Sequence, residues 1–235
     1  MTISSNAADQ GSGIYFKTSS SANLVNSILW NESGQEIYFF ENAGNENSIT
    51  ATYSDIQGGE EAIITNGDTI NWGTGNIDSD PLFVDAANGD YRLSAYSPAI
   101  GAGTSDGAPT IDIDGNIRPN PDGSNTDMGA YENALPSQLP KAGTIADGLT
   151  TDVNWWNSDS TLSAIWNTFT DNDAVTYEYA IGTSTSALAD VVDWTSNSSD
   201  TSVTKTGLTL TEGSTYYVSV RATDTDSQVS DTTTT

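Results

Sequence analysis

Short apolar runs, each ended within a few residues by glycine, proline, asparagine or aspartate, limit the fold of this chain more than any other feature. They are densest in the stretch 76–132, which contains Asn76-Ile-Asp-Ser-Asp-Pro-Leu-Phe-Val-Asp85 and Gly89-Asp-Tyr-Arg-Leu93. An amphipathic helix needs an apolar pattern that continues for about ten residues or more. This stretch never provides one, so the sequence predicts short strands joined by tight turns.

A weak internal repeat runs through residues 11–75. The matched units lie 23 to 27 residues apart, and they are short β-branched and aromatic runs. The matched units are Ile14-Tyr-Phe, Ile37-Tyr-Phe and Ile63-Ile, Leu24 and Ile49, and Ser27-Ile-Leu and Ser54-Asp-Ile. Such a period predicts stacked coils that each contribute strands to parallel sheets and bury apolar side chains against neighbouring coils. A leucine-rich repeat is disfavoured because its Leu-x-x-Leu-x-Leu pattern is absent.

The pattern changes at the segment 134–143, which contains two prolines and predicts a linker. From Thr144 onward apolar and polar residues alternate strictly, which predicts strands with one buried face. The predicted inward positions are Leu162, Ala164 and Trp166, then Tyr177, Tyr179 and Ile181, then Tyr216, Val218, Val220 and Ala222. We therefore expect a two-sheet sandwich over residues 144–235.

The composition excludes some functions. The 235 residues carry 32 Asp and Glu against 6 Lys and Arg, a formal net charge of −26. Nucleic acid is excluded as a partner because its phosphates need a basic face, and an anionic membrane surface is disfavoured for the same reason. No apolar run is long enough to span a bilayer, and the first residues do not have the basic-then-apolar pattern of a signal peptide. We expect a segment of a longer exported protein whose acidic surface attracts cations.

The stretch 76–132 also resembles the last coils of secreted right-handed parallel β-helix proteins. The resemblance rests on Asp80-Pro-Leu-Phe-Val-Asp85, Gly89-Asp-Tyr-Arg-Leu93, Ser97-Pro-Ala-Ile100 and Asp127-Met-Gly-Ala-Tyr-Glu132, which occur in that order. It implies an all-β chain in which coils and a terminal cap occupy residues 1–133. It also implies a secreted or cell-surface protein.

Residues 144–235 resemble a fibronectin type III module, an immunoglobulin-like β-sandwich. The run ending at Trp166 looks like its second strand, and Glu212-Gly-Ser-Thr-Tyr-Tyr-Val-Ser-Val-Arg-Ala222 looks like the corner before its sixth strand. The resemblance implies that the hydroxyl of Tyr216 bonds back to the backbone near Leu208.

Catalysis is not expected in this segment. β-Helix proteins include polysaccharide lyases and hydrolases, and a lyase needs a base and cationic groups around its uronate substrate. The chain has no histidine, and of its six basic residues only Lys17 lies outside the linker, the sandwich and the closing phrases. Acidic pairs for glycoside hydrolysis are too abundant here to be informative. The alternative is an accessory region of a lyase or glycoside hydrolase whose active site lies upstream of residue 1.

Two groups of oxygen-bearing side chains predict calcium-binding sites. Asp112, Asp114 and Asn116 are spaced as in the opening of a calcium loop, although position 123, where an EF-hand has glutamate, is glycine. The alternative is a turn stabilised by aspartate side chains bonding their own backbone. In the sandwich, Asp171, Asp173, Asp224 and Asp226 lie in two loops that share one end of the resembled module. The alternative there is solvated loop tips.

The favoured function is therefore structural and adhesive or glycan-binding, in a calcium-stabilised extracellular segment. Predicted partners are an extracellular polysaccharide, or neighbouring copies or domains of the same long protein. Exposed tryptophans could stack on sugars, with Trp30, Trp72, Trp155, Trp156 and Trp194 as candidates, although an exposed tryptophan more often covers a sheet edge.

Overall fold

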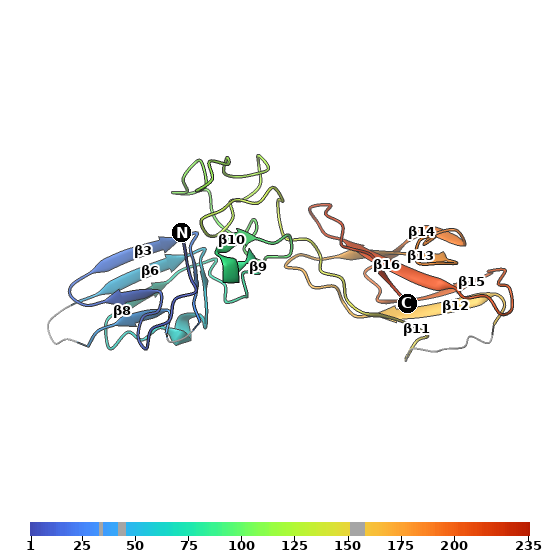
Figure 1. The fold of residues 1–235 in the computed structure, drawn as a ribbon, viewed down its shortest axis with the longest axis horizontal. Coiled ribbons are helices and arrows are strands. Elements are labelled where there is room, and N and C mark those ends of the chain that lie inside the picture. The colour runs from blue at the N-terminus through green and yellow to red at the C-terminus, as the bar shows by residue number, and fades with distance from the viewer. Residues whose placement is uncertain (33–34, 42–45, 151–157) are drawn as a thin grey trace. The chain divides into compact units, whose positions relative to one another are not determined.

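The computed structural model describes residues 1–32, 35–41, 46–150 and 158–235. They form two compact units, Met1–Gln138 and Leu139–Thr235 (Figure 1). Regular structure in these ranges is almost entirely β, with two single-turn 3-10 helices, η1 (Glu60–Ala62) and η2 (Ala86–Asn88). The all-β prediction is confirmed. The boundary between the units lies within the segment 134–143, and none of the described helices is long and apolar enough to cross a membrane.

The first unit is built from parallel strands that are each paired with a strand about one repeat away in the sequence. Its three parallel sheets are β1 (Thr2–Ser4), β4 (Ile28–Trp30) and β7 (Asp55–Ile56); β2 (Ile14–Phe16) and β5 (Ile37–Phe39); and β3 (Ser21–Val25), β6 (Ser48–Thr52) and β8 (Thr69–Trp72). Figure 1 shows β3, β6 and β8 side by side. Since parallel neighbours cannot be joined by a tight hairpin, the chain passes through the other sheets before it returns.

The registers place like residues on top of one another. Ile14, Tyr15 and Phe16 pair with Ile37, Tyr38 and Phe39, as the repeat predicted. Ser27 and Ser54 are also aligned, since Ile28 pairs with Asp55. The matching of Leu24 with Ile49 was wrong, because Leu24 pairs with Ala51 and Ile49 pairs with Ala22. That error of two residues keeps each side chain on its face, since side chains alternate with a period of two.

In β2 and β5 the alternation of side chains places one stacked aromatic pair in the core and another on the outer face. Phe16 and Phe39 stack in the core with ring centroids 4.7 Å apart, beside the fully buried Ile37 and Ile56. Tyr15 and Tyr38 stack on the outer face at 5.6 Å, where Tyr15 is 41% exposed. Each buried aliphatic or aromatic side chain contributes about 1.5–3 kcal/mol to folding.

The closing phrases of the first unit form a second core. β9 (Phe83–Asp85) and β10 (Asp90–Leu93) make an antiparallel pair connected through η2. Leu93, Ile100 and Met128 then pack against Ile28 of the stacked strands. The glycine of Ser97-Pro-Ala-Ile-Gly101 is required at this position: its φ is 63°, and a Cβ there would lie 2.1 Å from the carbonyl oxygen of Pro136.

The described residues of the second unit form two antiparallel sheets. One has the order β11 (Ile145–Asp147), β12 (Thr161–Trp166) and β15 (Ser202–Thr206), and the other the order β14 (Val192–Ser198), β13 (Thr176–Gly182), β16 (Tyr217–Thr223) and β17 (Thr233–Thr234). Their shared core contains Trp166 and Phe169, which meet the ring of Tyr177 edge to face at 5.7 and 5.4 Å.

The predicted inward positions are confirmed in these strands, although the intervening Ser163, Ala180 and Ser219 are buried as well. Ala164, Trp166, Tyr177, Tyr179, Ile181, Val218, Val220 and Ala222 are all buried, with Leu162 and Tyr216 packed at the edge of the same cluster. Each hydrophobic cluster formed by the described residues lies within one unit.

Candidate cation site

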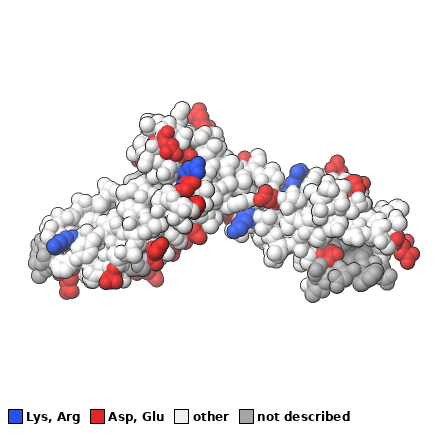
Figure 2. Space-filling view, in the orientation of Figure 1, with Lys and Arg blue, Asp and Glu red and all other residues white. Residues whose placement is uncertain are grey.

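Acidic side chains are scattered over the visible face of both units, while basic ones are sparse (Figure 2). In the described part of the chain, no three acidic side chains form a ready-made metal site. A more selective signal is a buried carboxylate oxygen without a hydrogen-bond donor, because folded proteins rarely leave a buried polar atom unsatisfied. Asp55, Asp171 and Asp224 each have such an oxygen, Oδ2, among the described residues.

The predicted loop at Asp112 has a different arrangement. Asp112 is 7% exposed, and its Oδ1 accepts hydrogen bonds from the backbone N–H groups of Asp114 at 2.9 Å and Asn116 at 2.8 Å. Its Oδ2 accepts from the Asn116 side-chain amide at 2.9 Å and from the Glu132 N–H at 3.0 Å. Both oxygens are therefore committed to protein donors, which favours the turn alternative. The metal role of Asp112, Asp114 and Asn116 stays a prediction.

The electrostatics of Asp112 agree with this arrangement. Burial acts to raise the pKa of its carboxyl, but the hydrogen bonds from Asn116, Glu132 and Asp114 outweigh burial and leave the pKa lowered. The side chains of Asp114 and Asn116 are exposed, and Gly115 takes the positive φ of 86° that closes the turn.

Arg118 ties this loop to the end of the first unit. Its Nη2 donates to the carbonyl oxygens of Gly129 at 3.0 Å and Tyr131 at 2.8 Å, and its Nε lies 3.0 Å from Oε2 of Glu132. The Nε–Glu132 contact is an ion pair without the alignment of a hydrogen bond. Arg118 is 8% exposed and therefore acts as a structural clamp.

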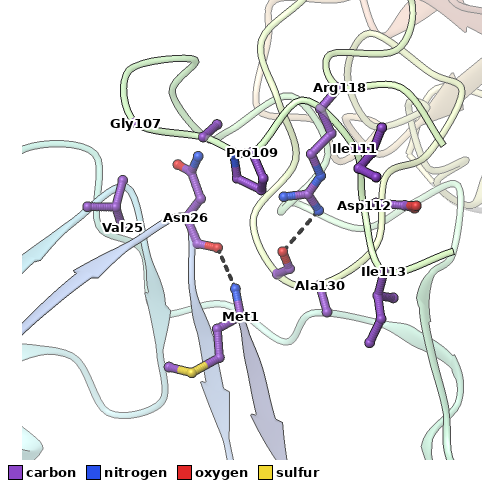
Figure 3. Close-up of a pocket in the computed structure, with 12 residues that line it drawn as sticks. Met1, Val25, Asn26, Gly107, Pro109, Ile111, Asp112, Ile113, Arg118 and Ala130 are labelled. Atoms are coloured by element: carbon purple, nitrogen blue, oxygen red, sulfur yellow. Dashed lines mark hydrogen bonds between the residues drawn. The ribbon is translucent and has the colours of Figure 1, made fainter. Parts of the chain in front are cut away.

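A cavity of about 210 Å³ lies next to this clamp (Figure 3). Met1, Val25 and Asn26 line one side and Ile111 and Ile113 the other. The terminal amine of Met1 donates to the carbonyl oxygen of Asn26 at 3.2 Å, and the Asn26 side chain bonds to Thr104 through both its oxygen and its nitrogen. These polar groups are engaged within the protein, so the cavity offers few free ligand-binding groups.

The structure brings the two acidic loops of the second unit together. Asp171 lies between β12 and β13 and Asp224 directly after β16, and Thr176 at the start of β13 pairs with Thr223 at the end of β16. Oδ1 of Asp171 accepts from the Asp173 N–H at 2.7 Å, and Oδ1 of Asp224 accepts from the Gln228 N–H at 2.8 Å. Each loop therefore holds one oxygen in a local turn and leaves Oδ2 buried without a donor among the described residues.

The charges of this site act on one another. Burial raises the pKa of Asp171, and repulsion from Asp224 and Asp173 raises it further against the hydrogen bond from Asp173. Burial likewise raises the pKa of Asp224, and Asp226 and Asp173 add to the rise. Asp224 is 7% exposed, whereas Asp173 and Asp226 are exposed at the rim. Protonation or a bound cation would relieve the repulsion between these carboxyl groups.

The tryptophan candidates differ in their surroundings. Trp166 is 3% exposed in the core, and the guanidinium of Arg221 lies 4.2 Å from the ring centroid of Trp194, over its face. Trp30 and Trp72 pack against the clusters of the first unit. Trp155 and Trp156 lie outside the described residues. Sequence reasoning missed the outward stack of Tyr15 and Tyr38, although the repeated Ile-Tyr-Phe unit signalled it.

No family model matches the chain, and no curated protein matches it significantly.

Proposed function

We propose that this chain is a calcium-stabilised structural or adhesive segment of an exported protein, in which right-handed parallel β-helix coils precede a fibronectin type III-like module. The coil assignment is supported by the parallel pairing of like residues at repeat spacing. The module assignment is supported by the seven strands that the described residues form in two antiparallel sheets. It is also supported by the Tyr216 hydroxyl, which accepts from the Thr211 N–H at 2.8 Å, three residues beyond the expected position.

The observation that carries the calcium proposal is the pair of buried, donor-free oxygens on Asp171 and Asp224. The ligands on offer are oxygen atoms, and the chain contains neither histidine nor cysteine, which suits Ca²⁺ rather than a transition metal. Asp173 and Asp226 supply further carboxylates at the rim. Burial raises the pKa of Asp171 and of Asp224, and a bound divalent cation would offset the repulsion that adds to this rise.

The test is thermal unfolding of the full chain in calcium and in chelator at matched ionic strength. Calcium at about 100 times its Kd should stabilise the second unit by about 2.7 kcal/mol. For a domain of this size such a gain raises the melting temperature by several degrees or more. The double variant Asp171→Asn plus Asp224→Asn should lose this rise, because its neutral side chains bind calcium poorly.

The matched control is Asp200→Asn, which removes an exposed charge elsewhere in the same unit and should keep the rise. In chelator the double variant should unfold at or above the wild-type temperature, since it no longer carries the mutual repulsion of Asp171 and Asp224. An equal rise in the double variant, or an equal effect of sodium, would show that calcium acts only on the general acidic surface.

The structural part of the proposal predicts that the segment alone cleaves no polysaccharide. Among the described basic side chains, three arginines are already paired with acids: Arg92 with Asp90, Arg118 with Glu132 and Arg221 with Glu178. Assays of new reducing ends and of unsaturated sugars on alginate, pectin and chondroitin should therefore stay at background. Activity that disappears in Lys17→Ala would instead support an enzyme. The proposed partners are an extracellular polysaccharide or neighbouring copies or domains.

A further inference from the structure

Asp55 lies at a fully buried position of the first unit, between two isoleucines of neighbouring segments. It follows Ser54 in β7, its backbone pairs with Ile28 on one side and bridges to Ile77 on the other, and its exposed fraction is 0%. Oδ1 accepts a hydrogen bond from the Ser79 N–H at 3.2 Å. Oδ2 is buried and has no donor among the described residues. A charge so placed is costly unless a partner compensates it.

The carboxyl group of Asp55 points into a turn with two further aspartates. Ser79, which donates to Oδ1, stands between Asp78 and Asp80 in the chain. Oδ1 of Asp78 accepts from the Gly58 N–H at 2.9 Å, and Oδ1 of Asp80 accepts from the Leu82 N–H at 3.0 Å. Each bond engages one oxygen of an exposed side chain and leaves the second oxygen for a ligand.

The electrostatics add to this geometry. Burial is the main cause that raises the pKa of Asp55 from 3.8 to about 8, and the charges of Asp78 and Asp80 raise it further against the hydrogen bond from Ser79. A proton on Oδ2 would neutralise the carboxyl group of Asp55 alone. A cation, in contrast, would satisfy that oxygen and offset the repulsion among all three groups.

We propose that Asp55, Asp78 and Asp80 form a calcium site, with Oδ2 of Asp55 as the interior ligand and the two exposed carboxylates as the ligands on the solvent side. The three carboxylates are not preassembled in the described structure. The site therefore requires the side chains of Asp78 and Asp80 to turn toward Oδ2 of Asp55 on binding, with backbone carbonyls and water as the remaining ligands. Variable coordination number and flexible geometry suit Ca²⁺ better than Mg²⁺, which requires a near-ideal octahedron. This site lies in the other unit and does not depend on Asp171 and Asp224.

The experiment uses the full chain carrying Asp171→Asn and Asp224→Asn. This background removes the candidate site of the second unit, so any remaining calcium effect can be tested at Asp55. Calorimetric calcium titration and the melting temperature of the first unit are measured with and without Asp55→Asn. Calcium should bind and raise the melting temperature in the parent chain. The Asp55→Asn chain should lose that rise and bind at least tenfold more weakly. Asp122→Asn, an exposed aspartate of the same unit, is the matched control and should change neither.

Asp55→Asn changes a buried side chain and could impair folding, so a second variant tests the site through its exposed residues. Asp78→Asn plus Asp80→Asn changes only exposed side chains and should also abolish the calcium-dependent rise. Circular dichroism in chelator checks that every variant folds. The proposal is overturned if the parent chain binds no calcium, if Asp55→Asn or the Asp78/Asp80 variant keeps the full rise, or if magnesium at equal ionic strength produces the same effect.

Discussion

Replacing Asp112 with alanine should destabilise the first unit by about 3 kcal/mol, equally with calcium and with chelator. The Asp112 carboxylate accepts four hydrogen bonds, one of them from the buried N–H of Glu132. A buried donor left without its acceptor costs about 1–3 kcal/mol. The three part-buried donors can turn to water, so each adds only a fraction of its hydrogen-bond energy, on the order of 0.5 kcal/mol.

The assay is urea unfolding of the full chain, with hydrogen exchange at Asp114, Asn116 and Glu132 as the local probe. Asp114→Ala is the control, because its exposed side chain can be removed at a cost within about 0.5 kcal/mol. Asp112→Asn should fall between wild type and Asp112→Ala, since Oδ1 is kept while an amide faces the Glu132 N–H. A loss of stability that occurs only in calcium would refute the turn argument and restore the predicted metal role of Asp112.

Three further predictions concern single side chains. Arg118→Ala should lower the free energy of unfolding of the first unit by about 3–5 kcal/mol, because it leaves the Glu132 carboxylate buried without its ion-pair partner. A loss under about 1 kcal/mol in urea unfolding would contradict the role of Arg118 as a clamp. Tyr216→Phe should cost the second unit about 1 kcal/mol through the lost bond to Thr211, and an unchanged urea midpoint would argue against that corner. Burial raises the pKa of Asp127 from 3.8 to about 7, so the native state holds this proton more tightly than the unfolded chain. Its stabilising contribution is complete below about pH 4 and is lost as the pH rises through about 7. In chelator, wild type should lose up to about 1.4 kcal/mol more per pH unit across this range than Asp127→Asn, and parallel pH profiles would contradict the assignment.

The sequence predicted the features that depend on period. Repeated Ile-Tyr-Phe units predicted like-on-like parallel pairing, and strict alternation predicted which side chains of the second unit face the core. Leu24 was misaligned because a shift of two residues keeps every side chain on its face, so apolar pattern alone cannot separate the two registers.

The candidate sites were harder to predict, because one aspartate in an acidic chain resembles another until burial and hydrogen bonds are known. Asp112 matches a calcium loop in spacing, yet its oxygens accept four protein donors. Asp55 carried a usable signal in the sequence, since aligning Ser54-Asp-Ile with Ser27-Ile-Leu places it level with the buried Ile28. An acidic residue at an apolar repeat position marks a functional candidate more sharply than spacing does.

Hydrogen exchange of the full chain with and without calcium, at one ionic strength, tests calcium stabilisation most directly. The amides of Asp173 and Gln228 donate to Asp171 and Asp224, and that of Ser79 donates to Asp55. These three amides should exchange more slowly in calcium, while those of Asp114 and Asn116, which donate to Asp112, should not change. Unchanged exchange at Asp173 and Gln228, or a uniform slowing that sodium reproduces, would contradict the account.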